Sequence, residues 1–214
     1  MNTPQPTERS LVLTYLGLRK AIGIIGITLP FVLALGKMLL ESPGIQGSIS
    51  AYYYTVMRDV FVGAMCAIAV FMLSYRYEPR DDLVGDITCV FALGVALFPT
   101  APELDASEHQ GWIGGLHLAF AAGFFLCLAY FCLALFRRTA TDRQPTDRKL
   151  LRNTLYAVCG YTILGCLVAV AVLAVLPSSV PIKQLKPVFW LEATAILAFG
   201  LAWLTKGEAI LRDL

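Results

Sequence analysis

The chain has 214 residues, of which 57% are hydrophobic and 15% charged, and its net charge is +2. Soluble domains carry about 25% charged residues, so this composition excludes a water-soluble globular protein. The small net charge indicates no particular class of partner, and we do not expect the chain to bind nucleic acids.

The hydrophobic residues form six blocks close to the roughly 20 residues with which a helix crosses a bilayer. In lipid each backbone amide must bond within its own segment, so each block is predicted to be a helix. The sequence therefore predicts an all-α polytopic membrane protein, with a disordered cytoplasmic N-terminus over 1–10, a transmembrane domain over 11–207 and a cytoplasmic tail over 208–214. Residues 11–18 fit either a surface segment or an extension of the first helix. The six predicted helices are 21–40, 57–75, 83–101, 112–136, 153–176 and 187–205.

Lys and Arg are distributed unevenly between the two sides of these predicted helices. Thirteen of the 17 lie in the N-terminal segment, the links around 76–80 and 137–152, and the tail, and four lie on the opposite side. The positive-inside rule then places both termini in the cytoplasm. The first block is long and starts after about 20 residues, so it is predicted to stay as an anchor. We expect a multi-pass protein of the bacterial inner (cytoplasmic) membrane.

The link between the first two blocks contains the run SISAYYYTVMRD, residues 48–59. Tyrosines suit the headgroup layer, which explains part of this composition. Consecutive helical residues point about 100° apart, so at least one of Tyr52, Tyr53 and Tyr54 should turn toward protein. The hydroxyl of that ring then needs a hydrogen-bond partner.

Ionisable residues at membrane depth are candidates for a functional site. His117 and Glu192 lie at similar depths below the outer surface, Arg58 and Asp59 start the second block, and Lys37 lies near the outer end of the first. We therefore predict one outward-facing pocket that binds a lipid headgroup or a small polar molecule, for transport or sensing. Its predicted ligand-binding residues are Tyr53, Tyr54, Arg58, Asp59, His117 and Glu192.

Within this predicted pocket, Arg58 is expected to attract an anionic group and His117 to couple binding to pH near neutrality. Each member also has a structural interpretation. Asp59 and Glu192 lie near helix N-termini, where the macrodipole favours a carboxylate, and Lys37 can reach the interface. A lone histidine usually packs and forms hydrogen bonds.

Two other functional classes stay open. The first is an intramembrane lipid-modifying hydrolase that uses Ser48 or Ser50 with His117 and Asp59, with or without a metal held by His117, Asp59 and Glu192. The second is a structural or partner-binding membrane protein. No cofactor is expected, because the six cysteines fall inside the apolar blocks without a C-x-x-C pattern.

Asp86 lies near the inner end of the third block, where we expect it to pair with Arg76, Arg80, Arg19 or Lys20. The sequences DITCVFALGVA from Asp86 and EATAILAFGLA from Glu192 share the pattern [DE]-x-T-x-x-x-A-x-G-x-A. The third and sixth helices are predicted to run in opposite directions, as an inverted repeat requires. Such a repeat, which favours transport or gating, is a hypothesis.

The runs LRKAIGIIGITLP, SISAYYYTVMRDVFVGAM, ALGVALFPT and FWLEATAILAFGLAWLTKGE resemble an uncharacterised family of bacterial six-helix integral membrane proteins. The layout is also loosely similar to the DRAM-like and alkaline-ceramidase-like groups. The latter group uses several intramembrane histidines around zinc, whereas only His117 lies within a block here. The resemblance implies no particular function. From the predicted spans and outer pocket we expect membrane lipids and a lipid or small-molecule ligand as partners, and a homo-oligomer stays open.

Overall fold

The computed structural model describes residues 6–102, 107–138, 146–177 and 180–211, and all regular structure among them is helical. This confirms the predicted all-α class. Residues 1–5 and 212–214 of the predicted terminal segments lie outside the described residues. The described α-helices are α1 (Pro6–Leu40), α2 (Arg58–Leu73), α3 (Pro79–Leu97), α4 (Glu108–Tyr130), α5 (Asp147–Val175) and α6 (Pro187–Lys206). Two short 3₁₀ helices, η1 (Ser50–Tyr54) and η3 (Pro181–Leu185), precede α2 and α6, and a π-helical segment, η2 (Phe131–Leu135), follows α4.

Several helices begin earlier than their apolar blocks. α1 begins at Pro6, so residues 11–18 extend the first helix, and residues 6–10 are helical although we predicted disorder there. α5 begins at Asp147, where the Thr146 hydroxyl accepts a hydrogen bond from the Lys149 amide over 3.2 Å. The reason is that hydropathy locates only the apolar part of a helix, whereas caps determine where it starts.

Within the described ranges, four helical stretches are long and apolar enough to cross a bilayer: Leu16–Leu40, His109–Leu135, Asp147–Val175 and Pro187–Lys206. The other two helices fall short for different reasons. α2 has 16 residues, which span about 24 Å. α3 has 19 residues but carries Arg80, Asp81, Asp82 and Asp86. The structure therefore supports a helical membrane protein with four clear candidate spans.

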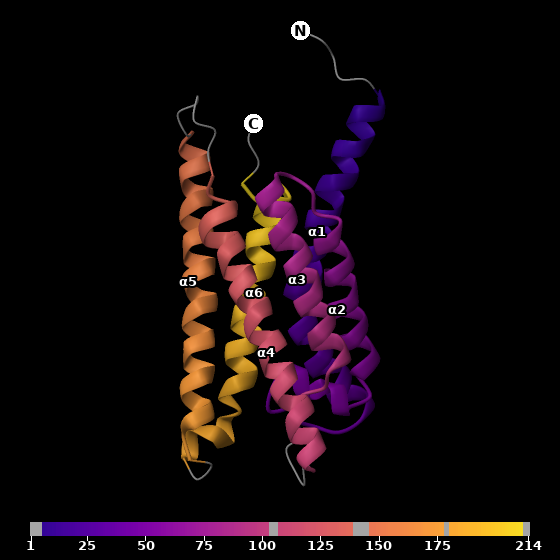
Figure 1. Ribbon diagram of the computed structural model, residues 1–214, viewed down its shortest axis with the longest axis vertical. Helices are drawn as coiled ribbons and strands as arrows, with labels where there is room; N and C mark the ends of the chain where they lie inside the picture. Colours follow the sequence, from indigo (N-terminus) through magenta and orange to yellow (C-terminus); the bar gives the residue numbers. More distant parts are fainter. Residues whose placement is uncertain (1–5, 103–106, 139–145, 178–179, 212–214) are drawn as a thin grey trace.

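The helices form a bundle whose members alternate in direction, and α1 begins at the end where α6 finishes (Figure 1). Each helix packs against the next along the chain, and α6 also packs against α1, which closes the ring. We call the end that holds the link 74–78 the inner end and the end that holds residues 41–57 the outer end, after the predicted orientation. At the inner end Asp86 pairs with Arg76 over 2.8 Å, as expected.

The contact between α1 and α6 depends on a glycine. A Cβ atom at Gly200 would lie 2.8 Å from the Ile27 amide nitrogen and 2.9 Å from the Gly23 carbonyl oxygen. Without a side chain at this position the two helix backbones approach closely, as membrane helices do at small residues. This contact places Glu192, two turns earlier on α6, beside the chain that follows α1.

Candidate functional site

The chain between α1 and α2 folds back into the outer end of the bundle. Ile49, Ser50, Ala51 and Tyr52 are buried there, and we call residues 45–54 the inserted segment. Its backbone is joined to the start of α6, because the Gly47 carbonyl accepts a hydrogen bond from the Phe189 amide over 3.0 Å. The Lys186 side chain donates a second bond to the Ile45 carbonyl. The link is therefore part of the packed bundle.

The three consecutive tyrosines of this segment differ in burial: Tyr52 is buried, Tyr53 half-buried and Tyr54 exposed. Tyr52 is fully buried and its hydroxyl accepts a hydrogen bond from the Gln46 amide over 3.4 Å. Burial raises the pKa of Tyr52 above its ordinary value. Tyr54 is exposed, and its hydroxyl donates to the Thr100 carbonyl over 2.7 Å. The expectation that at least one ring turns toward protein is confirmed.

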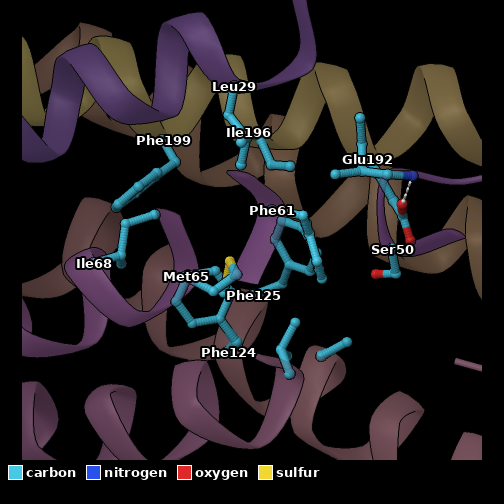
Figure 2. Close-up of a pocket in the computed structure, with 13 residues that line it drawn as sticks. Leu29, Ser50, Phe61, Met65, Ile68, Phe124, Phe125, Glu192, Ile196 and Phe199 are labelled. Atoms are coloured by element: carbon cyan, nitrogen blue, oxygen red, sulfur yellow. Dashed lines mark hydrogen bonds between the residues drawn. The ribbon is translucent and has the colours of Figure 1, made fainter. Parts of the chain in front are cut away.

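Glu192 lies on the second turn of α6 and forms a hydrogen bond with the backbone of the inserted segment. Its Oε2 atom accepts a hydrogen bond from the Ile49 amide over 2.6 Å. Figure 2 shows this bond, with Glu192 and Ser50 at one end of an apolar cavity. The amide lies where η1 begins, so the carboxylate satisfies a donor that would otherwise be left without an intrahelical partner.

The cavity in Figure 2 is small, with a volume of about 30 Å³. That is room for one or two water molecules. Its polar walls are Ser50 and Glu192, and all its other walls are apolar. We call it the inner cavity; it is lined by Leu29, Ile49, Ser50, Phe61, Met65, Ile68, Val95, Ala121, Phe124, Phe125, Glu192, Ile196 and Phe199.

A larger cavity of about 310 Å³ lies between α4, α5 and α6. We call it the lateral cavity, and Glu192 is the one charged residue in its wall. Ala121, Phe125 and Glu192 line both cavities and so separate them. The rest of its wall consists of Leu118, Ala122, Ile163, Cys166, Leu167, Val170, Ala171, Ala174, Leu191 and Ala195.

His117 has a local structural partner. It is 2% exposed, and its Nδ1 atom lies 2.7 Å from the Phe98 carbonyl oxygen. A carbonyl oxygen only accepts, so Nδ1 carries the proton and donates it. This bond ties α4 to the residue that follows α3. His117 is not part of the wall of either cavity.

Arg58 and Asp59 lie on the surface of the outer end. Their side chains are 58% and 91% exposed and form an ion pair over 3.4 Å. Together with Tyr53 and Tyr54 they line one open depression. Asp59 points outward because it precedes the buried Phe61 by two residues, or about 200° around the helix. Lys37 is buried, and its ammonium donates to the Ser42 hydroxyl over 2.8 Å.

The structure therefore does not bring the six predicted site residues into one pocket. Tyr53, Tyr54, Arg58 and Asp59 share the surface depression, whereas His117 bonds the backbone after α3 and Glu192 adjoins the two cavities. The sequence predicts a common depth for these residues, and that depth stays a prediction; it did not give the direction of each side chain. Their roles in ligand binding stay predictions.

The arrangement gives little support to hydrolytic chemistry. Among the described residues no group of three or more His, Cys, Asp and Glu side chains could hold a metal ion. His117 donates its hydrogen bond to the Phe98 carbonyl, and Asp59 forms an ion pair with Arg58. Among the described residues these two side chains therefore do not form a catalytic triad with Ser50. The chemistry available at Glu192 is hydrogen-bond acceptance, or charge pairing with a cation.

Two features of the site were not predicted from the sequence. The partner of Glu192 is a backbone amide, which every non-proline residue possesses and which no residue pattern identifies. The lateral cavity results from small residues on three helices, such as Ala122, Ala171 and Ala195. A search for alanines that face one another could have indicated the cavity, but only once the helix neighbours were known.

Comparisons of the chain with protein-family models, with curated proteins and with solved structures find no match. The geometry of Glu192 and the two cavities is therefore the basis for a functional assignment. The resemblance to the bacterial six-helix family stays a prediction.

Proposed function

We propose that this chain is a non-enzymatic inner-membrane protein that binds a lipid-like molecule in the lateral cavity, for transport or sensing. All six helices cross the membrane, and both termini lie in the cytoplasm. The apolar part of the ligand occupies the space between α4, α5 and α6. A hydroxyl, amide or ammonium group of the ligand donates a hydrogen bond to Glu192.

The observation that carries this proposal is the position of Glu192. It is the one charged residue in the wall of a cavity of about 310 Å³ that is otherwise lined by apolar side chains and a thiol. Ligand pockets combine mostly apolar walls with a few placed polar groups, and their volumes start at about 300 Å³. A carboxylate at membrane depth is costly unless it has partners, and Ile49 provides one of them.

The proposal differs from the sequence prediction in the character of the ligand. The predicted outer pocket would have held a headgroup among polar side chains. The lateral cavity instead favours an apolar body with one donor group, because Glu192 is the one strongly polar side chain in its wall. The open depression around Tyr53 and Arg58 is a separate surface feature.

Two valine substitutions on α5 test the proposal. Val170 lines the lateral cavity, whereas Val168 is 64% exposed on the outside of the bundle. Val170→Phe should fill part of the cavity, and Val168→Phe adds the same ring to the lipid-facing surface. We expect lipid-like molecules that copurify with the wild-type chain to be depleted in Val170→Phe and retained in Val168→Phe. Equal retention in both folded variants would remove the proposal.

A structural or partner-binding role is the second candidate, and one observation favours it. Most of the outer polar side chains are already paired within the chain: His117 with Phe98, Tyr54 with Thr100 and Arg58 with Asp59. Such pairing leaves few groups available for a ligand at the outer end. A wild-type protein that copurifies without any lipid-like molecule would favour this candidate.

A further inference from the structure

The negative charge of Glu192 has no cationic partner in the bundle. Its hydrogen bond comes from the Ile49 amide, which is a neutral donor. Within the described ranges no Lys, Arg or His side chain forms an ion pair with Glu192. A carboxylate has about four acceptor positions, and the Ile49 amide uses one of them. Acceptor positions therefore remain for a donor that enters the lateral cavity, whose wall includes Glu192.

The cationic and imidazole groups of the outer end bond other atoms. Lys183 and Lys186 each donate to a backbone carbonyl, and Lys37 donates to a side-chain hydroxyl. His117 bonds a backbone carbonyl as well. In the described part of the chain none of these four residues belongs to the wall of the lateral or the inner cavity. A ligand with a positive charge can thus compensate Glu192 without displacing a protein cation.

The wall of the lateral cavity favours an organic cation over other ligands. Phe125 lines the same two cavities as Glu192, and an aromatic ring can add attraction for a cation. The carboxylate would repel an anionic group strongly, because apolar surroundings screen charge poorly. A neutral donor would leave the negative charge in place. The remaining wall is aliphatic apart from the Cys166 thiol, so the rest of the ligand must be apolar.

We infer that the ligand of the lateral cavity is a lipophilic amine that carries a single positive charge. Its ammonium group pairs with the Glu192 carboxylate, and its hydrocarbon part fills the space between α4, α5 and α6. One carboxylate balances one positive charge, so a second cationic group on the ligand would lie uncompensated against apolar walls, which is costly. This inference rests on the proposed occupancy of the lateral cavity and narrows its ligand to cations.

Three probes with the same eight-carbon chain test the charge: octylamine, octanol and octanoate. Near pH 7 the amine is protonated and the carboxylic acid is ionised. Equilibrium dialysis against the purified full-length chain in neutral detergent measures binding, with protein-free micelles as the background. We expect octylamine to bind most tightly, octanol about tenfold more weakly and octanoate not at all, because a bond between two opposite charges is stronger than one with a neutral donor. Equal binding of octylamine and octanol would overturn the inference.

Two carboxylate variants connect this preference to Glu192. Glu192→Gln keeps an oxygen that can accept the Ile49 bond but removes the charge, so octylamine should bind about tenfold more weakly while octanol changes less. Glu41→Gln is the matched control. Glu41 also accepts a hydrogen bond from a backbone amide, that of Val56 over 2.9 Å, but it lies outside the walls of both cavities. Equal losses of octylamine binding in the two variants would contradict the inference.

The valine variants separate this inference from the proposed function. Octylamine and octanol should both bind more weakly to Val170→Phe than to Val168→Phe. If they do so but bind the wild type equally, the lateral cavity is a ligand site and only its preference for cations is wrong. If neither probe distinguishes the two variants, the proposed function fails and the inference fails with it. The comparison of probes on the wild type keeps the inference testable even if Glu192→Gln does not fold.

Discussion

The Glu192 carboxylate accepts a hydrogen bond from the Ile49 amide over 2.6 Å and so joins positions 143 residues apart. The bond fastens the inserted segment to α6 at the outer end of the bundle. Hydrogen bonds to charged groups contribute more than neutral ones, about 1.5–3 kcal/mol each. Glu192 thus combines a structural bond with its place in the wall of both cavities.

Removal of this carboxylate should loosen the inserted segment. Glu192→Ala leaves the Ile49 amide without its acceptor, so we expect a loss of about 1–3 kcal/mol in the free energy of unfolding. Glu192→Gln keeps an amide oxygen that can accept the same bond and should lose less. Hydrogen exchange at the Ile49 amide should become faster in Glu192→Ala. Thr194→Ala, at an exposed position of the same helix, is the control, and an equal loss there would contradict this role.

We expect His117 to be a packing residue that contributes to stability through the hydrogen bond donated by its Nδ1 atom. His117→Ala removes the bond to the Phe98 carbonyl and leaves this half-buried acceptor without its donor, which costs about 1–3 kcal/mol. The amide nitrogen of asparagine can take the position of Nδ1, so His117→Asn should recover part of the stability. Thermal unfolding of the three proteins measures this order. Equal stability of His117→Asn and His117→Ala would show that the Phe98 bond contributes little.

The ion pairs of Arg138 should differ in strength according to burial. The Asp81 side chain is 3% exposed and that of Glu78 is 56% exposed, yet both lie about 3 Å from the same guanidinium. Breaking a buried pair leaves a charge poorly solvated, so Asp81→Asn should cost about 3 kcal/mol. Glu78→Gln should cost less than about 1 kcal/mol. Denaturant or thermal unfolding of both variants tests this, and similar losses would mean that burial does not separate the pairs.

The helices were predictable because long apolar blocks have no other stable form in lipid. The face that each helix turns toward the bundle interior was harder to predict. α2 is apolar on most sides, so polarity does not distinguish its buried positions Phe61, Met65 and Ile68 from their neighbours. Depth along a helix can be counted from the sequence, but the direction of a side chain depends on which helices are neighbours. Asp59 and Glu192 therefore have similar predicted depths and quite different surroundings.

The repeated pattern that begins at Asp86 and Glu192 falls on α3 and α6, which run in opposite directions in the bundle (Figure 1). Its glycines, Gly94 and Gly200, each lie at a contact with another helix: a Cβ at Gly94 would meet Phe120 of α4 at 2.2 Å, and Gly200 adjoins α1. The carboxylates that start the two patterns have different partners, however, since Asp86 pairs with Arg76 and Glu192 with a backbone amide. The inverted repeat stays a hypothesis, with the glycine contacts in its favour.

Whether α2 and α3 each span the membrane is the part of the proposed topology that most needs a direct test. With 16 residues, or about 24 Å, α2 is shorter than the roughly 30 Å hydrocarbon core. Local thinning of the bilayer accommodates such a mismatch at modest cost, and the packing of α2 against α3 stabilises the pair. We therefore expect both helices to cross, with Val56 outside and Arg80 inside.

Cysteines introduced at exposed positions can measure this arrangement. Val56 and Gln184 are exposed at the outer end and Arg80 at the inner end, whereas the native cysteines are buried or half-buried in helices. A membrane-impermeant maleimide should label Val56→Cys and Gln184→Cys in spheroplasts, and Arg80→Cys only after lysis. The parent chain gives the background labelling. Labelling of Val56→Cys and Arg80→Cys from the same side would show that α2 does not cross, because Val56 lies just before α2 and Arg80 lies after it, at the start of α3.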